Sequence, residues 1–176
     1  MFLAPQPGAI SMFEGDGGLK KEIRGLRLDA NGLHLEEKTC CFSYDQEALK
    51  NWSTPPPDYA LYQYRLSTDE NTLYRVDRDG KTILLDFIRD SWSIPLTKWG
   101  IDAHKYPDVA TCRIVSKRKD RLFGETRFIV DVHCEAQSEE CESIVFSWSF
   151  ASGLGFIAIN DFMLRQVNVK PVYRKN

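Results

Sequence analysis

The fold is decided by residues 143–160, which read SIVFSWSFASGLGFIAIN. Between 143 and 150, large apolar residues alternate with serines, and only Val145 breaks the alternation. The apolar set is Ile144, Phe146, Trp148 and Phe150. Because successive side chains of a strand point to opposite faces, this pattern predicts a half-buried strand. Residues 151–153 then predict a turn, and residues 154–159 predict a returning strand.

The glycines of this stretch do not predict a phosphate-binding loop. Such a loop leads into a helix and usually carries a lysine followed by serine or threonine. No such lysine is present, and the residues after Gly155 are typical of strands. Gly155 instead permits a bulge or a close approach of two backbones. No window of 18 uninterrupted apolar residues occurs, so we predict no transmembrane helix.

Strands are also predicted on both sides of this stretch. The final third of the chain divides into apolar runs at 111–118, 126–134, 143–150, 154–159 and 162–173. Two earlier hairpins are predicted, one pairing Leu28 with Leu33 and Leu26 with Leu35, the other pairing Val76 with Ile83 around an Asp79-Gly80 turn. Short strands separated by tight turns predict a single antiparallel meander sheet.

The middle of the chain has less periodicity. Three prolines at 55–57 predict an extended loop, because proline cannot donate a backbone hydrogen bond. Tyr44 to Trp52 predict a short helix before that loop. Residues 91–110 predict a loop with one helical turn that packs Trp92 and Trp99 over the core.

Size and charge place the chain among ordinary globular domains. Its 176 residues suffice for one domain with a substantial core, so we assign residues 1–176 to a single β-rich domain. The net charge of −2 gives no general attraction to nucleic acid or to anionic membranes. The first ten residues lack the basic start of a signal peptide. We therefore expect a cytoplasmic location, or a periplasmic one if the chain is the processed form of an exported protein.

The five cysteines do not predict a metal site, because no Cys-x-x-Cys occurs and the three histidines are scattered. We expect neither a metal nor a cofactor. Aligning Val130 with Ile144 and Phe128 with Phe146 places Cys134 opposite Glu140, which disfavours a disulfide to Cys141 unless a bulge intervenes. The favoured interpretation is that the cysteines are structural thiols, with Cys112 in the core.

Asp131 and His133 are the candidate catalytic residues. They lie two apart on a predicted strand, so their side chains share one face about 6–7 Å apart. A carboxylate near an imidazole orients and charges it for acid–base chemistry. The alternative is a solvated sheet face with charge pairs, which we favour because no nucleophile or metal ligand has a motif that places it beside them.

A basic cluster occupies residues 117–121, which read KRKDR. Nucleic-acid binding is disfavoured because neither aromatic residues nor a known motif accompany these cations. We interpret the cluster as a solubilising connection between two strands.

The pattern Trp148-x-Phe150-x-x-Gly153-x-Gly155-Phe156-Ile157 resembles the aromatic and glycine strand pair near the end of several bacterial exported or lipoprotein-like sheet proteins, similar to lipoprotein carriers. The resemblance covers about residues 143–160. It implies a sheet curved into a half-barrel or barrel over an apolar cavity. It implies no catalytic residues.

Together these patterns predict a mainly β domain with one or two short helices. We expect a non-catalytic binding protein that holds a small apolar ligand or a protein partner on its curved sheet. The residues expected to make that contact are Trp92, Trp99, Trp148 and Phe150. The alternative is an enzyme with hydrolase-like acid–base chemistry at Asp131 and His133. No nucleic-acid partner is expected, and the sequence leaves the oligomeric state open.

Overall fold

A single antiparallel sheet forms the fold. The computed structural model describes residues 6–16, 19–40, 60–69, 71–78, 80–96, 108–137 and 143–169. In this part of the chain there are twelve strands. They are β1 (Ile10–Glu14), β2 (Lys20–Asp29), β3 (Gly32–Cys40), β4 (Ala60–Asp69), β5 (Thr72–Asp77), β6 (Gly80–Asp86), β7 (Trp92–Pro95), β8 (Val109–Leu122), β9 (Glu125–Ala136), β10 (Ile144–Ala151), β11 (Gly155–Ile159) and β12 (Phe162–Val169).

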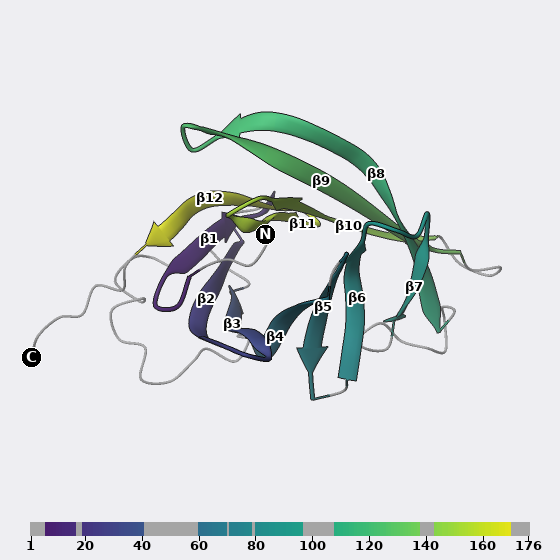
Figure 1. Cartoon of the computed structure of the whole chain (residues 1–176), viewed down its shortest axis with the longest axis horizontal. Coiled ribbons are helices and arrows are strands. Elements are labelled where there is room, and N and C mark those ends of the chain that lie inside the picture. Colours follow the sequence, from purple (N-terminus) through teal and green to yellow (C-terminus); the bar gives the residue numbers. More distant parts are fainter. Residues whose placement is uncertain are drawn as a thin grey trace, which may run out of the picture.

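The order of the strands nearly closes the sheet into a barrel. Consecutive strands are neighbours from β1 to β6 and from β7 to β12, and β1 also pairs with β12. The two edges of the sheet are therefore β6 and β7. Figure 1 shows the sheet curving until these edges stand near each other. The predicted mainly β, antiparallel and curved fold is confirmed. We call the junction between β6 and β7 the seam.

The decisive stretch forms β10 and β11. Phe146, Trp148 and Phe150 are buried, and the alternating serines lie half-buried on the opposite face. Phe150 pairs with Phe156 across the two strands, and their ring centroids are 4.4 Å apart. The turn between them contains Gly153 at φ 75°, a backbone conformation that glycine accepts without strain. Alternation thus places three large aromatic side chains inside the curved sheet.

The hairpin of β8 and β9 is the longest in the described part of the chain. Its end extends over β11 and β12 in Figure 1. A second apolar cluster there consists of Ile129, Ala151, Leu154 and Ile157, with Leu122 and Leu164 packed against it. Residues 117–121 lie within β8, so the prediction that they form a connecting loop is wrong.

No α-helix occurs among the described residues. The predicted helix at Tyr44 to Trp52 lies outside them, as do residues 55–57. Residues 92–95, predicted as loop, form β7 and pair with 109–112 of β8. The prediction failed there because four residues are too few to show a period of two.

Three predicted registers differ from the structure. In the first hairpin Leu28 pairs with Leu33 as expected, but a bulge places Gly25, not Leu26, opposite Leu35. In the second, Asp77 pairs with Gly80 and Tyr74 with Ile83, a shift of two residues from the expected pairing of Val76 with Ile83.

The third difference concerns β9 and β10. Phe150, not Ile144, pairs with Val130, and Phe146 pairs with Cys134. Phe128, expected to stack on Phe146, lies beyond this pairing and is 36% exposed. The core faces of both strands are nevertheless as predicted, because the shift is an even number of residues.

A disulfide joins Cys112 of β8 to Cys134 of β9, and both residues are fully buried. The two cysteines stand directly opposite each other in the register of these strands. The interpretation of these two as thiols is therefore wrong, although the predicted core position of Cys112 is confirmed. The side chains of Cys40, Cys41 and Cys141 lie outside the described residues.

Candidate functional site

Two tryptophans join the strands on either side of the seam. The indole N–H of Trp92 in β7 donates to the carbonyl of Ile83 in β6 over 3.2 Å. The indole N–H of Trp148 in β10 donates to the carbonyl of Leu84 in β6 over 2.7 Å. A buried indole needs such an acceptor, because an unpaired N–H away from water is costly. Trp92 thus ties β7 to β6 across the seam, and Trp148 ties β10 to β6 through a buried hydrogen bond.

The residues predicted to contact a ligand lie in the core. Trp92, Trp148 and Phe150 are at most 4% exposed and belong to one apolar cluster inside the sheet. Trp99 lies outside the described residues. A ligand between these aromatic side chains would have to displace rings that already pack against one another, so the surface beside the seam is the better candidate.

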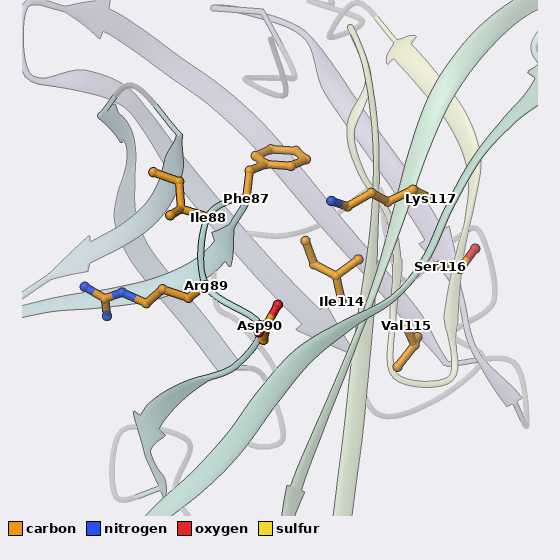
Figure 2. A pocket seen from close by; sticks show the side chains of 8 residues that line it. All are labelled: Phe87, Ile88, Arg89, Asp90, Ile114, Val115, Ser116 and Lys117. Atoms are coloured by element: carbon orange, nitrogen blue, oxygen red, sulfur yellow. The ribbon is translucent and has the colours of Figure 1, made fainter.

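A hollow of about 270 Å³ opens at that surface. We call it the seam pocket. Figure 2 shows it between the loop that follows β6 and the middle of β8. Its lining residues are Phe87, Ile88, Arg89, Asp90, Ile114, Val115, Ser116 and Lys117. Ile88 is 74% exposed and Val115 is 54% exposed, so apolar surface is presented directly to water.

Asp86 holds the loop wall of the seam pocket in place. Its side chain is buried, and one carboxylate oxygen accepts the backbone N–H groups of Ile88 and Arg89 over 2.9 and 3.1 Å. The other oxygen lies 3.4 Å from the Arg89 guanidinium. A buried carboxylate that accepts two backbone N–H groups fixes the turn, because both donors would otherwise lose their partner. The loop therefore presents Ile88 from a fixed backbone.

The strand wall of the seam pocket is cationic. Lys117 extends from β8 toward Phe87, and its ammonium lies 5.5 Å from the ring centroid. This is within the range of a cation–π contact between the two walls. Lys117 is exposed, and so are the next four residues of β8.

A second hollow of about 350 Å³ lies on the outer face of β8 and β9. We call it the β8–β9 pocket. It is lined by Val109, Thr111, Arg113, His133, Glu135, Ala136 and Gln137. His133 stands opposite Arg113 in the register of the two strands. The candidate histidine thus lines a pocket, together with a cation and a carboxylate that sequence reasoning did not place beside it.

Asp131, the other catalytic candidate, has different partners. One carboxylate oxygen accepts the hydroxyl of Ser149 over 2.6 Å. The other forms an ion pair with Arg118. Asp131 is not among the residues that line the β8–β9 pocket. These contacts resemble the charge pairing of a solvated sheet face.

A polar cluster that the sequence did not reveal lies among β2, β3, β4 and β5. The Lys21 ammonium is 2.7 Å from a carboxylate oxygen of Glu37, and both side chains are about one-tenth exposed. Burial raises the pKa of the Tyr64 hydroxyl well above its ordinary value, and the charge of Glu37 raises it further. The Arg75 guanidinium lies 4.4 Å from the Tyr64 ring centroid. Arg75 also pairs with Asp77 over 3.3 Å, so the two cations and two carboxylates of this cluster balance, which suits a structural role.

Within the described segments, no three His, Cys, Asp or Glu side chains gather as a metal site would require. Nor does any helix in those segments have the length and apolar character to cross a membrane. Comparisons with family models, with curated proteins and with solved structures gave no match. The resemblance of residues 143–160 to exported half-barrel proteins therefore stays a prediction.

Proposed function

We propose that this domain is a non-catalytic binding protein that receives a protein partner at the seam pocket. The observation that carries the proposal is the exposed apolar pair, Ile88 and Val115, on two walls whose backbones are fixed. Exposed apolar residues rimmed by polar ones are typical of protein-contact surfaces.

A protein suits the seam pocket better than a small apolar ligand does. Pockets that enclose a small molecule usually measure about 300–1,000 Å³ and bury most of its surface. The seam pocket, at about 270 Å³, is smaller and opens to water. One anchoring side chain from a partner would fill it, while the remaining contacts would spread over β8 and the loop 87–90.

The test begins with a photo-crosslinking amino acid placed at position 88, and at position 163 as control, in the host of the protein. Met163 on β12 is 49% exposed and lies outside the seam pocket, so it matches Ile88 as an exposed apolar residue. A partner captured only from position 88 is then purified and its affinity for the domain measured. We expect Ile88→Asp to weaken binding at least about tenfold, because a desolvated carboxylate replaces an apolar contact.

Met163→Asp should change that affinity less than about twofold. Equal capture from both positions would contradict the proposal. An equal loss of affinity in both variants would also contradict it.

Acid–base chemistry at the β8–β9 pocket is the second candidate function. It is favoured by one observation, the gathering of His133, Arg113 and Glu135 around the same hollow. The test is hydrolysis of p-nitrophenyl esters and phosphate esters by the purified protein and by its His133→Gln variant. Activity that disappears in the variant supports an enzyme, and equal rates in both proteins exclude His133 as its acid or base.

A further inference from the structure

The edge of β8 has no neighbouring strand along most of its length. β8 runs from Val109 to Leu122, but β7 pairs only with its first four residues, Val109 to Cys112. Among the described residues, no strand lies beside 113–122 on the side away from β9. Such an edge presents backbone N–H and C=O groups that another strand can use.

The register shows which backbone groups point outward. Cys112 and Cys134 are directly opposite with Cα atoms 4.0 Å apart, which is the close spacing of a pair that exchanges no backbone hydrogen bonds. The N–H and C=O of Cys112 therefore point toward β7. Two residues further on, those of Ile114 point the same way, beyond the end of β7 and beside the seam pocket that Ile114 lines.

This edge is strongly basic. Residues 113–122 read RIVSKRKDRL, with five cations and one acid. Arg118 is paired with Asp131, while Arg121 donates only to the neutral carbonyl of Gly124 and keeps its charge, so Arg113, Lys117, Lys119 and Arg121 make the edge basic. Two copies of the chain would repel each other here, which is one way proteins prevent their edges from pairing. A strand of opposite charge meets no such barrier.

We propose that the partner adds an extended acidic segment as a strand along 113–118 of β8, with one apolar side chain in the seam pocket. This inference rests on the proposed function and names the chemistry of the partner. Backbone hydrogen bonds to Ile114 would supply affinity, and the pocket and the cations would supply selectivity. The bulge between Ile114 and Ser116 limits regular pairing to short stretches on either side of it.

The test uses a labelled, end-capped peptide of alternating Glu and Val, about eight residues long, as the probe. Two control peptides accompany it, one with Lys in place of Glu and one with alternate backbone nitrogens methylated. Binding to the intact domain is measured by fluorescence anisotropy, up to about 1 mM protein. We expect saturable binding of the acidic peptide alone, weakened at least about tenfold by methylation, which removes the hydrogen-bond donors.

Charge-reversed variants of the domain distinguish a loss of binding caused by the changed charge from one caused by unfolding. The double variant Lys117→Glu/Lys119→Glu should lower the affinity for the acidic peptide at least about tenfold. Lys20 on β2 is also an exposed lysine, and Lys20→Glu should change that affinity less than about twofold. Urea midpoints confirm that all variants fold. Equal binding of the methylated or the Lys peptide, or no binding of the acidic peptide, would overturn strand addition. The proposed function would stand or fall separately, by the Ile88→Asp measurement with the captured partner.

Discussion

Removing the disulfide between Cys112 and Cys134 is expected to cost the domain a large part of its stability. The bond joins β8 to β9 inside the core, and both residues are fully buried. It closes a loop in the unfolded chain between residues 22 positions apart. The double variant Cys112→Ala/Cys134→Ala opens that loop without leaving a thiol behind.

The magnitude follows from the length of the loop. The chain-entropy relation, applied to this separation of 22, gives about 3.4 kcal/mol at 25 °C. Stabilities of single domains are about 5–15 kcal/mol, so this is a large fraction of the whole. With an m value of about 2 kcal/mol per molar urea, the unfolding midpoint should fall by about 1.7 M.

The assay is equilibrium urea unfolding followed by tryptophan fluorescence, for the oxidised protein, the reduced protein and the double variant. We expect the reduced protein and the variant to unfold at similarly lowered midpoints, and reductant to have no further effect on the variant. Peptide mapping of the oxidised protein under thiol-blocking conditions should recover Cys112 bonded to Cys134. A midpoint that does not move, or a mapped bond from Cys134 to Cys141, would refute the reasoning.

Three other perturbations follow from the geometry. Trp148→Phe leaves the buried carbonyl of Leu84 without its indole donor, so the free energy of unfolding measured in urea should fall by about 2–3 kcal/mol. At Gly32, where φ is 129°, an added Cβ would lie 2.2 Å from the carbonyl oxygen of Leu66, so Gly32→Ala should lower the free energy of unfolding by about 3 kcal/mol. At Gly124, where φ is 85°, an added Cβ would meet no atom within 4 Å, so Gly124→Ala should lower it by only about 1–2 kcal/mol. The raised pKa of Tyr64 should give a late ionisation step in an absorbance titration, and that step should be missing in Tyr64→Phe. Stability should fall as the pH rises above 10.0, because the phenol ionises in the unfolded chain while its raised pKa keeps it neutral in the fold.

Alternation predicted β9, β10 and β11 and the faces that β9 and β10 bury, because alternation is a local property, but it did not predict β1, β4 or β7. It did not predict how strands align. The pairing of β9 with β10 differs from the expected one by six residues, and that of β5 with β6 by two. The shift between β9 and β10 is even, as is that between β5 and β6 from Tyr74 to Asp77, and an even shift leaves each side chain on the same face. Alternation alone therefore distinguishes odd from even alignments but not one even alignment from another.

The disulfide was missed for the same reason. The register that sets Cys134 opposite Glu140 and near Cys141 does not occur in the structure, and the true partner of Cys134 lies on the preceding strand. A signal was nevertheless present: Cys112 shares a face with Ile114, and Cys134 shares a face with Val130 and Val132. Two cysteines on the core faces of consecutive strands meet whenever the hairpin between them has the matching length, here a turn at Phe123 and Gly124.

The seam pocket was not predictable from local patterns, because its walls come from segments that only the curvature of the sheet brings together. Trp92 and Trp148 were expected to contact a ligand, since aromatic residues on strands often do. The structure uses them to reach Ile83 and Leu84 across the seam. Which of these roles a tryptophan has depends on whether an acceptor lies within reach of its N–H, and that acceptor belongs to a strand far away in the sequence.

The open seam explains why β8 has an uncovered edge, and its cations and the adjoining seam pocket distinguish this edge from other uncovered stretches of the sheet. A closed barrel has no edge, because every strand has two neighbours. Here two carbonyls of β6, those of Ile83 and Leu84, already accept indole N–H groups, and the first four residues of β8 are covered by β7. The short length of β7 leaves the rest of β8 uncovered. If β7 were lengthened by insertion of residues that pair with Ile114 and Ser116, the sheet would gain hydrogen bonds and the edge of β8 proposed for strand addition would be covered.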